Sequence, residues 1–184
     1  MPITPLKRFW TCHWQNKFWR DDVNEESRPI VAAGSNLFAA KGVRPGDRLY
    51  IVSIVEGQLL FGGRMTVDAI LLREAVMARL GSDDLHEDSK WWAVGAKEAG
   101  TPLDLHRALS PEVTRKLRFV APSGPPKKPQ FVSDTHLDGQ TTRGVRQLTQ
   151  ESAELLEQIL TASDKRPRSL ELRTISLKDF ALGV

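Results

Sequence analysis

The sequence contains a single cysteine, Cys12, among its 184 residues, so no disulfide can form within the chain. A lone cysteine favours a reducing compartment. No apolar run approaches the roughly 20 residues that a membrane-spanning helix requires. The N-terminal residues also lack the apolar core of a secretory signal. These absences predict a cytoplasmic protein that makes no use of a membrane.

The motifs of several enzyme classes are also missing. No glycine-rich loop follows a predicted strand and opens a helix, which argues against nucleotide hydrolysis and dinucleotide binding. No Gly-x-Ser-x-Gly segment is present. The histidines are widely spaced and have no partner cysteines, so we expect neither a metal site nor a cofactor. Cys12 and His13 are strand neighbours that point apart, which favours a buried cysteine over a thiol nucleophile. We assign no catalytic residue and favour a non-catalytic role.

The composition that remains is that of an ordinary globular protein. A hydrophobic content of 40% with 27% charged residues excludes a wholly disordered chain. The net charge of +3 is compatible with a polyanionic partner without requiring one. The basic residues gather in four short clusters, which would contact phosphates if several of them share a face and are otherwise solvated surface. The clusters are Arg115–Lys116–Arg118, Lys127–Lys128, Arg143–Arg146 and Lys165–Arg166–Arg168.

Residues 42–67 carry the clearest structural pattern. A Pro45–Gly46 turn leads into residues 49–55, which are rich in β-branched and aromatic types, and Glu56–Gly57 supplies a second turn. This order predicts a β-hairpin over roughly residues 48–70. Gly62–Gly63 in the second strand predicts a β-bulge, or a point where another group closely approaches the backbone.

The rest of the chain predicts short strands and short helices, which together favour a compact α+β domain over a parallel βαβ array. We expect strands at 6–14, 91–95 and 117–121, a polar loop at 15–28, and helices at 37–41, 73–80, 111–116 and 149–160. Gly42 ends the expected helix at 37–41, and Gly81 ends the one at 73–80. Four prolines prevent regular structure at 121–129. We divide the chain into a domain of residues 1–162 and a basic linker with a tail or added strand at 163–184.

The order of these features resembles the PUA-like superfamily, and the EVE and ASCH branches most closely. The resemblance covers roughly residues 6–160 and is carried by an aromatic first strand, Ser35–Asn36 before a short helix, the Gly42-x-x-x-Gly46–Asp47 turn, and Gly62–Gly63–Arg64. It implies a twisted pseudo-β-barrel of about five or six strands flanked by short helices. The opening departs from the usual EVE pattern, in which a tryptophan precedes a Lys-x-Glu-Pro run, so a divergent branch is expected.

Domains of the EVE type hold a flipped or free base in an aromatic pocket, and several read modified cytosine beside a restriction nuclease. The resemblance therefore implies a nucleic-acid partner, with modified DNA of the 5-methylcytosine type favoured and RNA as an alternative, and a partner nuclease. We expect the base to contact Trp10, Trp14, Trp19, Ser35 and Asn36. We expect phosphates to contact Arg115, Lys116, Lys127, Lys128 and Arg143.

The chemistry of base recognition suits these residue types. An aromatic ring returns about 1–3 kcal/mol of stacking to a base, while extrusion from a duplex costs a few kcal/mol. Edge hydrogen bonds from an amide or hydroxyl must supply the rest. Each residue also has a structural interpretation: two or three of the indoles should pack in the core, and Asn36 could simply cap the helix.

Two further functions stay open on the sequence. One is an ASCH-like enzyme acting on RNA or modified nucleosides, which would need Lys, Glu or Thr groups around the same cavity. The other is a general RNA-binding PUA-like domain. The helix at 149–160 could also serve to bind a partner nuclease.

Overall fold

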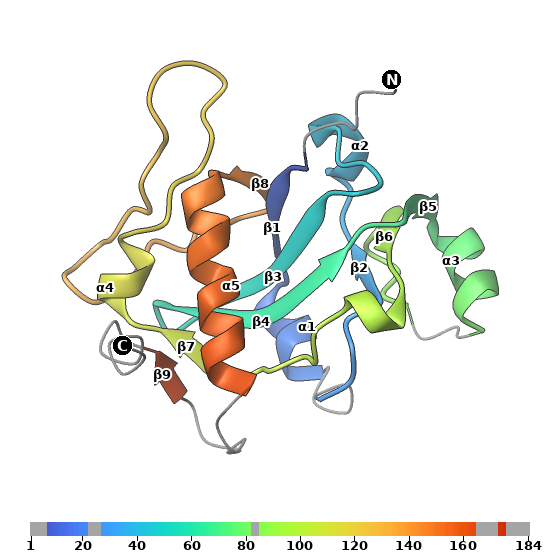
Figure 1. The fold of residues 1–184 in the computed structure, drawn as a ribbon, viewed down its shortest axis with the longest axis horizontal. Coiled ribbons are helices and arrows are strands. Elements are labelled where there is room, and N and C mark those ends of the chain that lie inside the picture. The colour runs from blue at the N-terminus through green and yellow to red at the C-terminus, as the bar shows by residue number, and fades with distance from the viewer. Residues whose placement is uncertain (1–6, 22–26, 82–84, 165–172, 176–184) are drawn as a thin grey trace.

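The computed structural model describes residues 7–21, 27–81, 85–164 and 173–175. It confirms an α+β fold, built on a six-stranded mixed sheet in the order β8-β1-β3-β4-β7-β9 and a three-stranded sheet in the order β2-β6-β5 (Figure 1). Within the described residues, the edge strands β8 and β9 are not paired with each other, so the strands do not form a closed barrel.

The elements have the following bounds. The strands of the large sheet are β1 (Phe9–His13), β3 (Arg48–Val55), β4 (Gln58–Thr66), β7 (Arg107–Leu109), β8 (Val145–Leu148) and β9 (Arg173–Ile175). Those of the small sheet are β2 (Ala32–Gly34), β5 (Ala69–Leu72) and β6 (Trp91–Val94). The helices are α1 (Asn16–Asp21), α2 (Phe38–Lys41), α3 (Arg73–Leu80), α4 (Pro111–Thr114), α5 (Gln150–Asp164) and the 3₁₀ turn η2 (Lys97–Ala99).

The predicted hairpin is confirmed as β3 and β4. Its turn residues Glu56 and Gly57 have φ angles of 51° and 75°, and positive angles at both positions are typical of a tight type I′ turn. Ile51 pairs with Gly63 while Val52 pairs with Phe61, so Gly62 is the extra residue of the predicted bulge. A side chain at Gly62 would lie 3.0 Å from the Trp19 ring, so the close approach to the backbone is also present.

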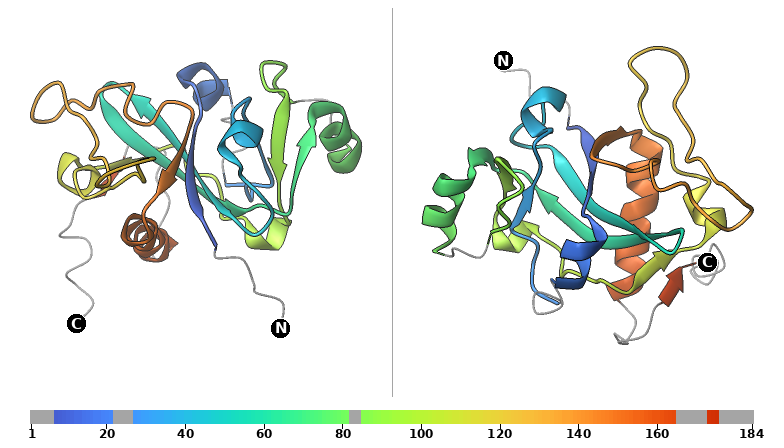
Figure 2. Two further views of the ribbon diagram at one scale, coloured as in Figure 1. Left: turned by 90° about the horizontal axis from the view of Figure 1, so that it is seen from above. Right: turned by 180° about the vertical axis from the view of Figure 1, so that it is seen from behind.

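The alternation of β3 divides the core into two layers. Tyr50, Val52 and Ile54 face the apolar side of α5, while Leu49 and Ile51 face the side that holds Phe38 and Ala93 of α2 and the small sheet. In Figure 1, α5 crosses the near face of the large sheet, and the views of Figure 2 place α1, α2 and β2 on the opposite face. A third, smaller cluster packs α3 against the outer face of the small sheet. The fold is therefore a stack of α5, large sheet, small sheet and α3.

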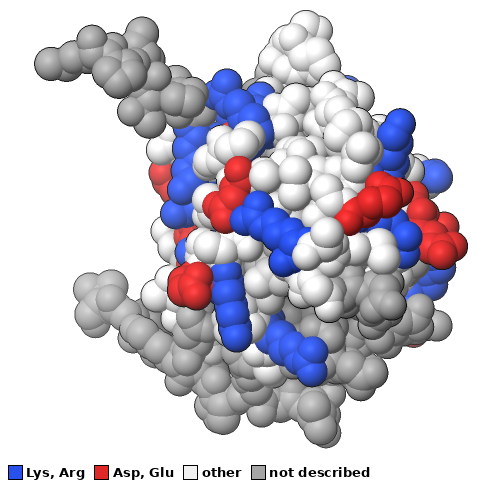
Figure 3. Space-filling model, turned by 90° about the vertical axis from the view of Figure 1, so that its right-hand side faces the viewer, with Lys and Arg blue, Asp and Glu red and all other residues white. Residues whose placement is uncertain are grey.

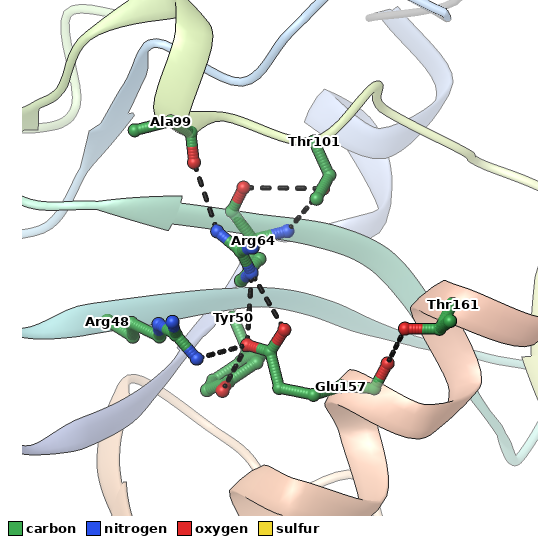
Figure 4. Close-up of polar contacts among 7 residues, drawn as sticks. All are labelled: Arg48, Tyr50, Arg64, Ala99, Thr101, Glu157 and Thr161. Carbon is green, nitrogen blue, oxygen red and sulfur yellow. Dashed lines mark hydrogen bonds and ion pairs between the residues drawn. The ribbon is translucent and has the colours of Figure 1, made fainter. Parts of the chain in front are cut away.

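A charged cluster helps to fasten α5 to the large sheet (Figure 4). The Glu157 carboxylate accepts hydrogen bonds from Tyr50 at 2.8 Å and from Arg48 and Arg64 at 3.0 Å each. Burial, followed by the nearby Glu157 charge, raises the pKa of Tyr50. Burial, with the charges of Arg48 and Arg64, lowers the pKa of Lys7. One carboxylate thus accepts hydrogen bonds from two guanidinium groups and one hydroxyl.

Two sequence predictions are wrong. Part of the expected polar loop at 15–28 is the helix α1, which forms because it can bury Trp19 against the sheet. The expected strand at 117–121 is not a strand, since only Phe119 makes isolated bridges, to Lys127 and Leu148. The strands β2, β7 and β8 were not expected.

The C-terminal elements belong to the same layers. The division expected after residue 162 falls inside α5, which continues to Asp164. β9 then pairs in parallel with β7, from Arg107 opposite Arg173 to Leu109 opposite Ile175, so an added strand is present at these residues. Among the described helices, none combines the length and apolar character needed to cross a membrane.

Candidate nucleic-acid interface

A long open groove lies at the junction of the two sheets, on the side away from α5. It has a volume of about 1470 Å³. Its lining comes from the end of β1 with α1 at 13–17, the β2 region at 28–37, Leu80 with residues 85–92, and the loop at 139–144, together with Ile54 and Leu103. Two of these segments pack directly against each other, because a Cβ at Gly144 would lie only 2.6 Å from the Leu37 side chain.

Trp14 is the aromatic residue that the sequence singled out and that lines this groove. It follows β1 directly, and its backbone N–H donates to the Val52 carbonyl at 2.9 Å, which extends the strand pairing by one residue. Its ring is half-buried and meets the buried Trp19 ring edge-on at 6.4 Å between centroids. Trp14 therefore presents an indole that is braced from behind and still partly open to solvent.

Ser35 and Asn36, for which the resemblance implies contact with a base, also line the groove. The Ser35 hydroxyl accepts from the Leu37 N–H at 3.2 Å, which leaves its own hydrogen free to donate. The Asn36 amide donates to the Asp88 carbonyl at 2.9 Å and accepts from the Lys90 N–H at 2.7 Å. Asn36 thus holds residues 88–90 in position as one wall of the groove.

His13, at the end of β1, is a groove residue that the sequence did not assign to the site. Its Nδ1 is 2.9 Å from the Thr142 hydroxyl, so it joins β1 to the 139–144 loop. Burial lowers the pKa of His13, and the positive charge of Arg143 lowers it further. The imidazole is consequently neutral near pH 7 and can both donate and accept a hydrogen bond.

The charged residues of the groove are mostly basic. Lys17, Arg28 and Arg143 line it, against one acidic residue, Asp88. Lys17 and Asp88 form an ion pair of 2.6 Å, in which both side chains are more than half exposed, so the pair adds little to stability. The hydrogen bond from Lys17, and then its charge, lower the pKa of Asp88. Among the described residues that line the groove, basic side chains therefore outnumber acidic ones, a balance that suits an anionic ligand.

Trp10 and Trp19 lie in the core and not on the groove. Trp10 is 4% exposed, and its indole N–H donates to the buried Asp47 carboxylate at 2.9 Å. Arg8 forms a 2.9 Å ion pair with the same carboxylate, and the Arg44 N–H donates to it. Trp19 is equally buried, and its N–H donates to the Leu105 carbonyl. The structure brings together Trp14, Ser35 and Asn36, and it places the other two indoles behind them.

The remaining indoles face opposite sides of β6, as their adjacency in a strand predicts. Trp92 packs with Val76 and Val94 in the outer cluster, and part of it reaches the groove. Trp91 is half-buried on the inner side, with the Lys90 ammonium 5.9 Å from its ring centroid, and it does not line the groove.

Some of the residues that we expected to contact phosphates line a cavity, and the others do not. Arg143 lines the groove, and Lys127 and Lys128 line a second hollow beside it. Arg115 lines neither, because it stacks on Phe131 at 4.2 Å and donates to the Asp134 carbonyl. Lys116 is exposed just after α4, also away from both.

The sequence did not single out His13, Lys17 or Arg28 for this site. Each is an isolated residue in its own segment, and only the pairing of β1 with β3 and β8 and of β2 with β6 brings the segments together. The local sequence therefore held no signal for them beyond their residue types.

The thiol of Cys12 is buried. Burial raises the pKa of the Cys12 thiol to about 12, so it is not a thiolate near neutral pH. Within the described ranges, no three His, Cys, Asp or Glu side chains are grouped so that they could hold a metal ion.

Comparison with protein-family models, curated proteins and solved structures finds no match.

Proposed function

We propose that this chain is a nucleic-acid-binding module of the PUA-like, EVE-like kind, which holds one base in the groove beside Trp14. In this proposal the base is a flipped, modified cytosine of the 5-methylcytosine type. The described strands form two sheets and not a closed barrel, so the pseudo-β-barrel that the resemblance implies remains part of the proposal. The observation that carries the proposal is a braced, half-open indole in a groove whose described charged residues are mostly basic.

The energetics of holding a base fit the groups beside Trp14. Stacking on one indole contributes about 1–3 kcal/mol, and extrusion of the base costs a few kcal/mol. The difference must come from hydrogen bonds to the base edge. The Ser35 hydroxyl and the neutral imidazole of His13 supply donors and acceptors, and Asn36 keeps the facing loop in place.

The size of the groove favours a polymer over a free nucleoside. At about 1470 Å³, it exceeds the roughly 300–1,000 Å³ of pockets for drug-sized molecules. Lys17, Arg28 and Arg143 lie where phosphates on either side of the base would need neutralising. A nucleotide chain with one base turned inward fills such a groove better than an isolated base does.

A methyl group on the base would find apolar contacts at the rim. Leu37 and Leu80 line the groove and are 39% and 36% exposed, so both are accessible to a ligand. Covering one methyl carbon contributes about 0.8 kcal/mol, which corresponds to a preference of about fourfold. We therefore expect a clear but modest selection for 5-methylcytosine.

The test is binding of the protein to duplexes that differ only in one 5-methylcytosine, measured across a salt series. The proposal predicts a methyl preference of about fourfold that persists as salt rises, because the methyl contact is not electrostatic. Equal affinity for both duplexes, governed by salt alone, contradicts the modified-base proposal. Tighter binding of an RNA of the same sequence would instead identify a general RNA-binding domain.

A further inference from the structure

A second hollow opens beside the groove, in the segment that connects α4 to β8. In Figure 1 this segment forms two loops that extend beyond the sheet. The hollow has a volume of about 510 Å³. The residues that line it are Phe119, Lys127, Lys128, Pro129, Gln130, Gln140, Thr141 and Arg146.

The charged residues of this hollow are all basic. Lys127, Lys128 and Arg146 line it, and no acidic residue among those that the structure describes does so. On the face seen in Figure 3, in contrast, basic and acidic side chains are interspersed. Within the described part of the chain, Lys127 and Lys128 are exposed and neither forms an ion pair. Their charges are therefore not neutralised by the fold.

The walls of the hollow are held in position by short-range contacts. Phe119 and Lys127 exchange backbone hydrogen bonds of 2.9 and 2.8 Å, which close the first loop at its base. The Arg146 guanidinium lies 6.0 Å from the Phe119 ring centroid and donates to the Gln140 carbonyl at 3.1 Å. The Thr141 hydroxyl and the Gln130 backbone also hydrogen bond to each other. The basic groups thus sit on a fixed backbone and do not depend on a ligand for their placement.

The hollow adjoins the groove. Gln140 lines both, and Arg143 of the groove and Arg146 of the hollow are three residues apart at the start of β8. Arg143 donates to the Gln140 side chain at 3.3 Å. A chain that leaves the groove beside Gln140 therefore enters the hollow lined by Arg146, Lys127 and Lys128.

We propose that this second hollow is a phosphate-binding subsite for the nucleotides that flank the base held in the groove. Arg146 and the two lysines contact the backbone phosphates, so the ligand is a strand that occupies both hollows. This proposal rests on the proposed function, since it supposes that the groove holds a base. It adds that residues outside the groove contribute to the affinity for a strand.

The test compares two ligands with the full-length protein. One is a single-stranded DNA of nine nucleotides with a central 5-methylcytosine, and the other is 5-methyl-2′-deoxycytidine, which has no phosphate. The test variant is Lys127→Ala with Lys128→Ala. The control is Lys41→Ala with Lys97→Ala, two exposed lysines that line neither hollow.

We expect the test variant to bind the oligonucleotide at least tenfold more weakly than the control. For this variant, the slope of the logarithm of the association constant against the logarithm of the salt concentration should be shallower by about 1.4. This value corresponds to two lost phosphate contacts at about 0.7 each for single strands. The affinity of the variant for the nucleoside should be unchanged. If the variant matches the control on the oligonucleotide, the second subsite is wrong while the groove stands. If the wild-type protein binds neither ligand, the proposed function itself fails.

Discussion

The replacement of Trp10 by phenylalanine tests whether this indole is structural. The change keeps an aromatic ring in the core and removes the N–H that donates to Asp47. Asp47 is 1% exposed and keeps Arg8 as its ionic partner and the Arg44 N–H as a donor. A hydrogen bond to a charged group contributes about 1.5–3 kcal/mol, so we expect the free energy of unfolding to fall by about that amount.

Urea denaturation followed by tryptophan fluorescence measures this loss. For a chain of this length, about 2 kcal/mol corresponds to a melting temperature lower by roughly 4–8 °C. Binding of the methylated oligonucleotide, measured well below that temperature, should be unchanged, because Trp10 does not line the groove. An unchanged stability together with a loss of affinity would refute the argument, since it would make Trp10 part of the binding site.

Three further predictions concern the fold and its response to pH. Gly57→Ala should destabilise the protein more than Gly46→Ala. Both glycines have positive φ angles, but only a Cβ at Gly57 would collide with a side chain, that of His136 at 2.2 Å. Equal unfolding midpoints of the two variants would contradict this. Glu157→Ala should lower the free energy of unfolding by about 1.5–3 kcal/mol, because charged hydrogen bonds are lost and Arg48, Arg64 and Lys7 are left facing one another. Added salt should restore part of this stability by screening the repulsion. An unfolding midpoint equal to that of the wild type would refute the role of the cluster. The pKa of His13 lies below the ordinary 6.5, so at pH values between the two the unfolded chain binds a proton that the folded chain does not, and stability falls as the pH drops through about 6.5. His13→Asn should flatten this part of the curve of stability against pH, and an identical curve would contradict the assignment.

Much of the fold could be predicted where a local signal decides the backbone. The hairpin of β3 and β4 follows from alternating apolar residues and from a turn whose positive φ angles suit glycine. Gly42 and Gly81 end α2 and α3 in the left-handed conformation, and Ser110 caps α4 through the Val113 N–H. These features depend on residues within one turn of each other, so the sequence contains them directly.

The rest of the fold depends on partners far away in the sequence. The three-residue strands β2 and β7 exist because β6 and β4 offer them hydrogen bonds, and no pattern within three residues can predict that. α1 was taken for a loop because its sequence is polar, but tertiary burial of Trp19 stabilises the helix.

The candidate site could be predicted only in part, because its segments also lie far apart in the sequence. The resemblance singled out Ser35 and Asn36, and it singled out Trp14 by its place on the expected first strand; all three line the groove. Trp10, on the same strand, could not be separated from Trp14 without knowing where Asp47 lies. His13 could not be assigned until the 139–144 loop was seen beside it.

The most direct test of the central claim is the affinity of Trp14→Ala for the methylated oligonucleotide, compared with that of Trp91→Ala. Both indoles are half-buried, and only Trp14 lines the groove. Loss of one stacked base, at about 1–3 kcal/mol, predicts a dissociation constant about 5- to 150-fold higher for Trp14→Ala and a value near the wild type for Trp91→Ala. Equal affinities of the two variants, with both proteins folded, would contradict the assignment of the groove as the base-binding site.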